Sequence, residues 1–182
     1  MYKFFKRFLD ILVSSITLII FLPIFIPIIV ILRFSAEGEV FYFQERYGIY
    51  NTKFKIWKFA TMLKNSMNMG TGSITIQNDP RVTKIGTFLR KTSLDELPNL
   101  LNVLQGQMSL VGPRPLVKYE SDLYGEYKEK RNSIKPGITG LAQIQGRLDL
   151  SLQERLYWDI KYVDEKSFNY DLIIILKTIY SV

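Results

Sequence analysis

The chain has 182 residues, enough for one folded domain with its own core, alone or joined to a membrane segment. Its 24 basic and 17 acidic residues give a formal charge of +7, which suits phosphates, anionic lipid headgroups or nucleic acid. It contains no cysteine and no histidine. This excludes disulfides, a catalytic thiolate, zinc bound by Cys or His, and a Ser-His pair. Chemistry must come from carboxylates, hydroxyls, lysine or arginine.

Residues 11–32, ILVSSITLIIFLPIFIPIIVIL, carry no charge and predict a retained membrane segment. As a straight helix they would reach about 33 Å, which is enough to cross a bilayer. A signal peptide would have a shorter apolar region and a clear small-residue cleavage site, and the residues that follow offer only a weak one.

Two topologies fit this segment. The basic residues that flank it are Lys3, Lys6, Arg7 and Arg33. Because positive charge prefers the cytoplasmic side, both ends are drawn to the same face of the membrane. Pro23 and Pro27 each lack an N–H and disturb the carbonyl four residues earlier, which favours a bend and a re-entrant helix. The alternative is a spanning helix with proline kinks, and the residues alone leave both open.

The rest of the chain predicts an α+β fold that is mainly α. Residues 40–59 alternate apolar and polar positions on either side of a Tyr-Gly-Ile-Tyr-Asn turn, which indicates a small β-hairpin. Helices are expected over residues 60–68, 93–104, 116–132 and 152–164. A rigid loop is expected over 109–115, and a turn with a short extended piece over 135–143. The apolar end, YDLIIILKTIYSV, is short for a span and suits an amphipathic helix in the membrane interface.

The sequence Ser93-Leu94-Asp95-Glu96 opens the helix expected over 93–104. Its spacing fits a capping box, in which Ser93 and Glu96 satisfy backbone N–H groups reciprocally. Asp95 and Glu96 could thus be capping charges, stabilised by the helix dipole by about 0.3–1 kcal/mol. They could also be catalytic, because without histidine a carboxylate is the natural nucleophile or base. An aspartate near a helix N-terminus beside arginines is expected to stay ionised, as a nucleophile must.

Arginines lie on both sides of the acidic pair. Arg90 lies just upstream, and Arg114 follows between Pro113 and Pro115. Flanking prolines reduce the conformational entropy lost when an arginine binds a ligand, and arginines can hold a pyrophosphate with bidentate geometry. Arg114 is therefore either a surface arginine in a turn or part of an anion-binding loop.

The motifs, in chain order, resemble those of one family. They are KRFLD, the proline-interrupted apolar run, QER, NDPR, LRKTSLDELP, MSLVGPRP and KPGITGLAQ. Over nearly its whole length the chain resembles the small monotopic phosphoglycosyl transferases of the bacterial sugar transferase family. The combination of Ser-Leu-Asp-Glu-Leu-Pro with Gly-Pro-Arg-Pro is highly specific.

The resemblance implies transfer of a sugar-1-phosphate from a UDP-sugar to a polyprenyl phosphate, usually undecaprenyl phosphate, with magnesium and release of UMP. This would be the first membrane step of surface polysaccharide or glycoprotein glycan assembly. It implies a re-entrant membrane anchor over residues 1–35 and a cytosol-facing catalytic domain with interfacial helices over 36–182. The expected location is the bacterial inner membrane, among phospholipids. No nucleic-acid partner is expected, and a homo-oligomer is compatible with the sequence.

The resemblance also assigns roles to residues. Asp95 matches the nucleophile that forms a phosphosugar-aspartyl intermediate, with magnesium beside it, and Glu96 matches its dyad partner. Arg90 and Arg114 match residues near the substrate phosphates or nucleotide. The substrate-binding set is completed by Pro113, Pro115, Arg147 and Lys58.

The chain departs from the family pattern in three places. Leu22 stands where a serine often precedes the helix-breaking proline, and Leu148 where an asparagine usually follows Arg147. Ala60 stands where an arginine is common, and two outcomes stay open: substrate binding is weakened, or Lys58 or Lys64 takes the place of the arginine.

Two other functions stay open on the residues alone. One is a non-catalytic, membrane-attached module whose basic surface binds anionic lipid or nucleic acid. The other is a transferase of similar shape that passes a different phosphorylated group to a lipid.

Overall fold

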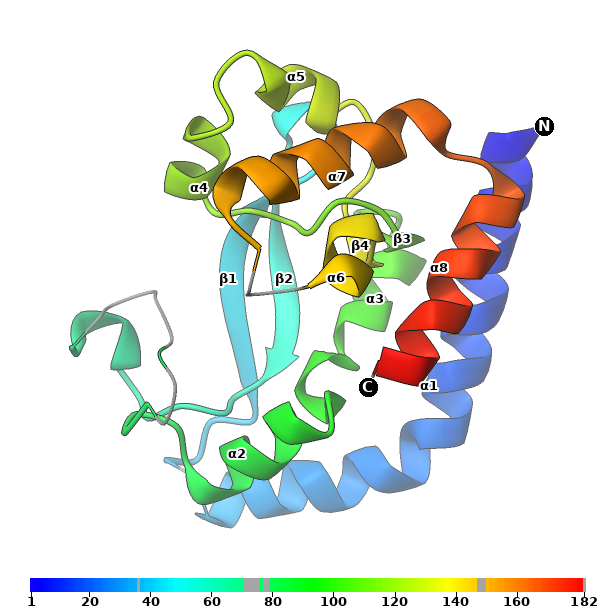
Figure 1. Ribbon diagram of the computed structural model, residues 1–182. Helices are drawn as coiled ribbons and strands as arrows, with labels where there is room; N and C mark the ends of the chain where they lie inside the picture. The colour runs from blue at the N-terminus through cyan, green and yellow to red at the C-terminus, as the bar shows by residue number, and fades with distance from the viewer. Residues whose placement is uncertain (36, 71–75, 77–78, 147–149, 182) are drawn as a thin grey trace.

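The computed structural model describes residues 1–35, 37–70, 76, 79–146 and 150–181 (Figure 1). Within these residues the fold is mainly helical with two small sheets, which confirms the predicted balance of helix and strand. The helices are α1 Tyr2–Ser35, α2 Lys84–Lys91, α3 Asn99–Leu104, α4 Lys118–Asp122, α5 Tyr127–Arg131, α6 Leu141–Gln145, α7 Leu152–Glu165 and α8 Phe168–Ser181. The strands are β1 Phe41–Tyr47, β2 Lys53–Phe59, β3 Ser109–Val111 and β4 Gly137–Thr139.

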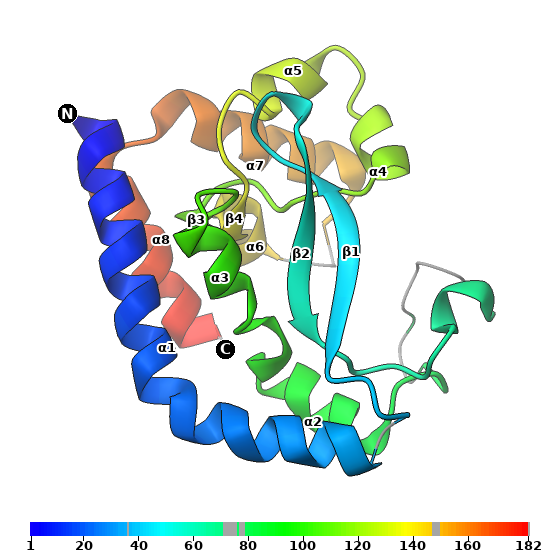
Figure 2. The ribbon, with the colours of Figure 1, turned by 180° about the vertical axis from the view of Figure 1, so that it is seen from behind.

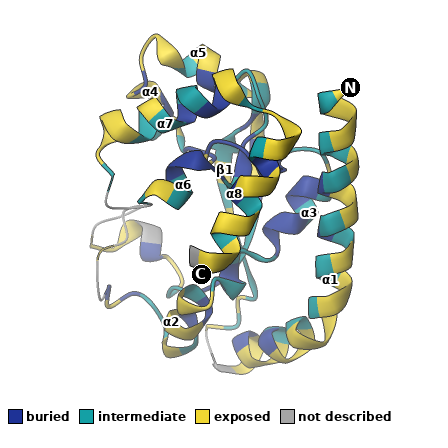
Figure 3. Ribbon diagram, turned by 45° about the vertical axis from the view of Figure 1, so that its right-hand side comes forward, coloured by how far each residue is buried: buried dark blue, intermediate teal, exposed yellow. Residues whose placement is uncertain are grey.

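Helix α1 is long and bent. Figures 1 and 2 show its first part beside α3 and α8 and its second part alongside α2. Pro23 and Pro27 lie inside it and each removes a backbone donor, a usual cause of a sharp bend. Among the described residues, α1 is the one helix long and apolar enough to cross a membrane. Most of its outer side is exposed (Figure 3).

Basic residues at the start of α1 bind the rest of the fold. The Lys6 Nζ lies 2.7 Å from Asp171 Oδ2 on α8. The Arg7 guanidinium donates to the carbonyls of Val103 and Leu104 at the end of α3, at 2.6 and 2.7 Å. Cations are favourable at a helix C-terminus, where carbonyls lack intrahelical partners. Lys6 and Arg7 were expected to be charges at the membrane face, whereas in the structure they hold α1 against the rest of the fold.

Both parts of α1 contact the same folded unit. Asp10 is buried and accepts a hydrogen bond from the Leu110 N–H of β3 at 2.9 Å. Further along, Leu32 packs against Phe59 of β2 and Leu89 of α2 in a small apolar cluster. The two ends of the helix are therefore fixed to one domain.

The predicted hairpin is confirmed. Strands β1 and β2 pair antiparallel, with Phe41 opposite Phe59 and Tyr47 opposite Lys53. Ile56 of β2 is buried in the core, and alternation along the strand puts Lys58 on the same side. The hairpin thus carries a lysine toward the 3₁₀ turn that precedes α3.

The helix predicted over 60–68 is wrong. A single 3₁₀ turn, Ser66–Asn68, occupies part of that stretch, and Met62 forms an isolated bridge with Val82. Helix α2, which the sequence argument did not predict, follows and is capped by the Thr83 hydroxyl, which accepts from the Gly86 N–H at 3.0 Å. A β-carbon on Gly86 would lie 2.1 Å from the Thr61 carbonyl oxygen, so only glycine fits this crossing.

The capping box at Ser93 is also wrong. Ser93 has φ 56°, in the left-handed region, and its side chain caps nothing. A 3₁₀ turn, Leu94–Glu96, follows, and α3 begins only at Asn99, after Pro98. Ser93 therefore lies between α2 and the 3₁₀ turn and does not start a helix.

The helix predicted over 116–132 is divided into α4 and α5. Gly125 lies between them at φ +51°, a left-handed conformation that a continuous right-handed helix does not allow. The helix predicted over 152–164 is confirmed as α7, with Ser151 and Glu154 as its capping box. The C-terminal segment is helical, as α8.

The segments predicted over 109–115 and 135–143 each contain a short strand, and the two strands pair in parallel. Ser109 of β3 lies opposite Gly137 of β4, and Val111 lies opposite Thr139. Their backbones approach so closely that a β-carbon on Gly137 would lie 2.1 Å from the Gly112 nitrogen. This contact fixes the position from which the Gly-Pro-Arg-Pro loop leaves the core.

Candidate active site

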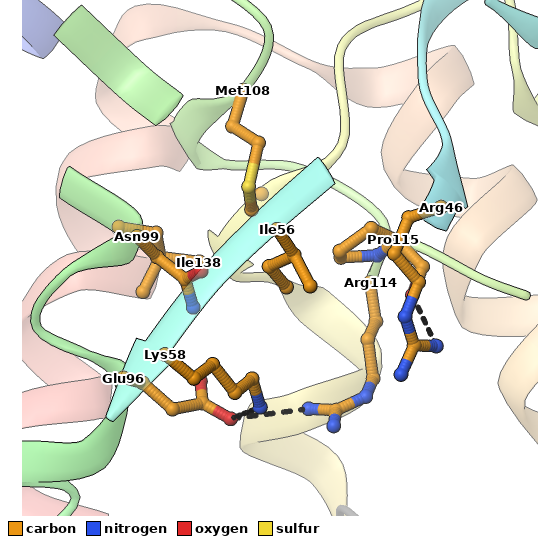
Figure 4. A pocket seen from close by; sticks show the side chains of 10 residues that line it. Arg46, Ile56, Lys58, Glu96, Asn99, Met108, Arg114, Pro115 and Ile138 are labelled. Carbon is orange, nitrogen blue, oxygen red and sulfur yellow. Dashed lines mark hydrogen bonds and ion pairs between the residues drawn. The ribbon is translucent and has the colours of Figure 1, made fainter. Parts of the chain in front are cut away.

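Three distant segments bring charged side chains together at one pocket (Figure 4). Lys58 comes from β2, Glu96 from the 3₁₀ turn before α3, and Arg114 from the loop after β3. The Lys58 Nζ donates to Glu96 Oε1 at 2.6 Å, and Arg114 Nη1 lies 4.0 Å from the same oxygen. The pocket is lined by Arg46, Ile56, Lys58, Glu96, Asn99, Met108, Arg114, Pro115, Gly137 and Ile138.

Cations outnumber the carboxylate in this lining. Arg46 is largely buried and donates to the Pro115 carbonyl at 3.2 Å and to Glu120 Oε2 at 3.4 Å. Its burial, and then the like charge of Arg114, lowers the pKa of the Arg46 guanidinium. Arginine remains charged under any ordinary condition, so the pocket presents positive charge to an anion.

Asp95 lies next to this cluster and is only 9% exposed. Burial raises the pKa of its carboxyl, Lys58 opposes that shift, Glu96 adds to it, and Arg90 opposes it. No other described residue donates a hydrogen bond to the Asp95 side chain or forms an ion pair with it. The α-helix N-terminus expected at Asp95 is absent, because this residue lies in a 3₁₀ turn, and burial has the largest influence on the pKa of its carboxyl.

Arg90 reaches the site from the last turn of α2. Its Nε donates to the Thr61 hydroxyl at 2.8 Å, which holds the guanidinium within electrostatic range of Asp95. Of the two lysines considered as replacements for the arginine absent at position 60, Lys58 lies in the site. Lys64 is exposed and pairs with Glu39 at 3.6 Å, away from the pocket.

The prolines around Arg114 have separate positions. Pro115 lines the pocket, whereas the Pro113 carbonyl accepts from the Gly137 N–H at 2.9 Å and anchors the loop on β4. The Arg114 carbonyl accepts from Arg131 Nη2 at 2.7 Å. Its backbone is therefore held while its side chain, 52% exposed, stays accessible. Of the predicted residues, Arg147 lies outside the described residues.

Three residues in or behind the site were not predicted as site residues: Arg46, Asn99 and Arg131. Asn99 follows Asp95 by four residues, and the helix predicted over 93–104 would have put both on one face, so this spacing was the signal that could have indicated it. Arg131 acts from α5 through the loop backbone, and no local pattern marks it.

The donor set fits a divalent cation that is shared with a substrate. Within the described residues, no three or more acidic side chains gather as a ready metal site. Magnesium commonly uses one or two carboxylates and completes its shell with substrate phosphates and water. Asp95, with no partner among the described residues, can supply such a carboxylate, whereas Glu96 is held by Lys58.

The chain was compared with known proteins. Residues 1–182 match the model of a family described as bacterial sugar transferase. The exopolysaccharide production protein ExoY of Rhizobium meliloti is 42% identical, covering 96% of this chain and 83% of that protein. The UDP-glucose:undecaprenyl-phosphate glucose-1-phosphate transferase of Escherichia coli is 40% identical over 96% of this chain and 39% of its own length. The undecaprenyl-phosphate galactose phosphotransferase of Salmonella typhimurium is 38% identical, over 97% of this chain and 40% of its own length.

Proposed function

The chain belongs to the bacterial sugar transferase family, and we propose that it transfers a sugar-1-phosphate from a UDP-sugar to undecaprenyl phosphate or another polyprenyl phosphate. The names of its relatives support this reaction, and that of the Rhizobium protein supports a role in surface polysaccharide assembly. The observation that carries the proposal is a buried aspartate, without a partner among the described residues, beside a pocket lined by cations.

The first half of the reaction follows from these charges. Lys58 and Arg114 bind the diphosphate of the UDP-sugar, and the Asp95 carboxylate attacks the phosphorus that carries the sugar. A bond forms between the Asp95 oxygen and that phosphorus, the bond to the bridging oxygen breaks, and UMP leaves. Burial makes the carboxylate more basic, while Lys58 and Arg90 favour its ionised form. A basic anion of this kind is a good nucleophile.

The second half restores the enzyme. An oxygen of the polyprenyl phosphate attacks the same phosphorus, and the bond to Asp95 breaks, leaving the carboxylate free. Magnesium belongs to the proposal: Asp95 and the substrate phosphates would hold it, and it would neutralise charge on the leaving phosphate.

Helix α1 serves in this proposal as a re-entrant anchor. Its ends contact one domain, through Asp10 and Leu32, which supports entry and exit on the same side of the bilayer. A straight spanning helix would separate its ends by the bilayer thickness. Both α1 and α8 carry many exposed residues (Figure 3), and the apolar ones among them support a lipid-facing surface. Examples are Phe4, Phe8, Ile11 and Ile16 on α1, and Leu172, Leu176 and Ile179 on α8.

We propose that the domain then lies on the cytosolic side of the inner membrane. There a soluble donor and an insoluble lipid acceptor can meet at one pocket, which is a gain of proximity. The expected interfacial position of α8 belongs to the same proposal, since α8 packs beside α1 and carries exposed apolar residues.

The test uses purified protein in detergent with a panel of UDP-sugars labelled at the sugar-side phosphate. UDP-glucose and UDP-galactose are tried first. We expect one UDP-sugar of the panel to leave label on the protein and to release UMP before any acceptor is added. Polyprenyl phosphate should then remove the label as lipid-linked sugar phosphate. UMP release that strictly requires the acceptor, with no labelled protein, would contradict the covalent intermediate. Absence of transfer from every UDP-sugar would contradict the function.

A further inference from the structure

Two asparagines of α3 are equally buried but differ in their hydrogen bonds. Asn102 is 0% exposed, and its Nδ2 donates to the Lys55 carbonyl at 2.8 Å and to Gln107 Oε1 at 2.6 Å. Its Oδ1 accepts from the Trp57 N–H at 3.0 Å. Asn99 is 1% exposed, yet neither Nδ2 nor Oδ1 has a hydrogen-bond partner among the described residues.

A buried asparagine whose only role is packing is not expected to leave both amide atoms without hydrogen bonds, as Asn99 does. Buried amides almost always find partners, because an unpaired one loses its hydration without replacement. Asn102 satisfies that rule and joins α3 to the hairpin. Asn99 breaks it, so its amide destabilises the fold relative to an apolar side chain of similar size.

The position of Asn99 indicates what could satisfy it. Asn99 lines the same pocket as Lys58, Glu96 and Arg114 (Figure 4). It lies three residues after Glu96 and four after Asp95, at the start of the helix that follows the acidic turn. A ligand that enters among these charges therefore comes next to the amide.

We propose that Asn99 is a substrate-contacting residue whose amide binds a neutral group of the UDP-sugar that has both a donor and an acceptor. The inference rests on the proposed function and names a contact within it. An ionised phosphate only accepts and would leave Oδ1 unpaired, and a metal ion would leave Nδ2 unpaired. Sugar hydroxyls and the edge of uracil each offer both kinds of group, so either can pair with the whole amide.

The test compares Asn99→Leu with the matched variant Asn102→Leu. Thermal unfolding of Asn99→Leu should occur at the wild-type temperature or higher, because no hydrogen bond is lost. Asn102→Leu should unfold several degrees lower, because it leaves the Lys55 carbonyl and the Trp57 N–H of β2 without their hydrogen bonds to residue 102. The KM of Asn99→Leu for the UDP-sugar should nevertheless rise by about tenfold or more, because leucine leaves the polar group of the substrate without its hydrogen-bond partners.

A binding measurement separates this contact from the reaction itself. In the Asp95→Asn background, which should bind but not turn over, titration calorimetry compares UDP-sugar with UMP. Weaker binding of UDP-sugar alone after Asn99→Leu assigns the contact to the sugar, and weaker binding of both assigns it to the nucleoside. Unchanged binding of both, or a fall in unfolding temperature equal to that of Asn102→Leu with an unchanged KM, overturns the inference. A wild-type protein that neither binds nor turns over any UDP-sugar would instead contradict the proposed function.

Discussion

Lys58 and Glu96 form an ion pair at 2.6 Å although 38 residues separate them in the chain. The pair joins the end of the hairpin to the acidic turn and gives the two neighbouring carboxylates different surroundings. Glu96 forms an ion pair with a lysine. Asp95 is buried, and no other described residue forms a hydrogen bond or an ion pair with its side chain. Adjacent acidic residues are thus divided into one that organises the cations and one that stays available for chemistry.

We expect Asp95→Asn to abolish transfer, by at least about 10³-fold, because an amide cannot form the acyl phosphate. The variant should remain folded and be as stable as wild type or more so, since it replaces a buried carboxylate that lacks a partner among the described residues with a neutral group. Retention of phosphate label on the protein measures the effect. Asp164→Asn, which alters an exposed ion pair on α7, is the control and should label normally. Label on the Asp95→Asn protein would remove this residue from the role.

Lys58→Met should shift the pH dependence of the first half-reaction. The positive charge of Lys58 lowers the pKa of Asp95, so its removal raises that pKa further. The ionised fraction is then lost at higher pH, and the acidic limb of the rate of labelling moves in the alkaline direction. The pH profile is more informative than the absolute rate, because Lys58 is also expected to bind the diphosphate.

Lys64→Met serves as the matched control for that shift. Lys64 is exposed and pairs with Glu39, so its removal should leave the limb in place. An unchanged acidic limb in Lys58→Met would mean that the titration of Asp95 does not govern the labelling step.

Local sequence signals predicted those parts of the fold that local forces determine. The hairpin over 41–59 follows from alternation around a turn, and α7 from apolar residues at helical spacing. Ser93 shows the limit of such signals. Its Ser-x-x-Glu spacing is that of a cap, but Ser93 has a left-handed backbone between α2 and the 3₁₀ turn, and its side chain caps no helix. The parallel pairing of β3 with β4 is long-range, and no local pattern predicts it.

For the candidate site, the sequence predicted individual residues but not how they come together. Asp95, Glu96 and Arg114 stand out because their residue types suit phosphate chemistry and their neighbours are unusual. Their meeting with Lys58 depends on the tertiary fold. The character of Asn99 depends on which of its atoms lack partners, a property of packing that two asparagines in one short helix do not share. Sequence spacing alone treats them alike.

Arg114→Ala should lose activity while leaving the fold intact. The side chain is 52% exposed and its contact with Glu96 is long, at 4.0 Å. Exposed ion pairs contribute about 0–1 kcal/mol, so the free energy of unfolding should barely change. Loss of a diphosphate contact should raise the KM for the UDP-sugar or lower kcat, by about tenfold or more. Steady-state UMP release measures this, with Lys130→Ala on α5 as an exposed-pair control. Near-normal turnover would make the loop structural.

Arg131 and Asp159 support the same loop from behind. Their ion pair is 2.7 Å long with both side chains at most 4% exposed, and Arg131 also donates to the Arg114 carbonyl. Arg131→Met should destabilise the protein by about 3–5 kcal/mol, because it leaves the Asp159 carboxylate buried without its partner. Urea unfolding in detergent measures the loss.

The double variant Arg131→Met with Asp159→Leu separates the two functions of this pair. It removes both charges, so most of the stability lost in Arg131→Met should return. The Arg114 carbonyl, however, still lacks its donor, so UMP release should stay below that of the wild type. If stability and activity recover together, the Arg131 hydrogen bond does not position Arg114. If neither recovers, the loss comes from the cation–π contact of the Arg131 guanidinium, which lies 4.9 Å from the centre of the Tyr124 ring, rather than from the unpaired Asp159 charge.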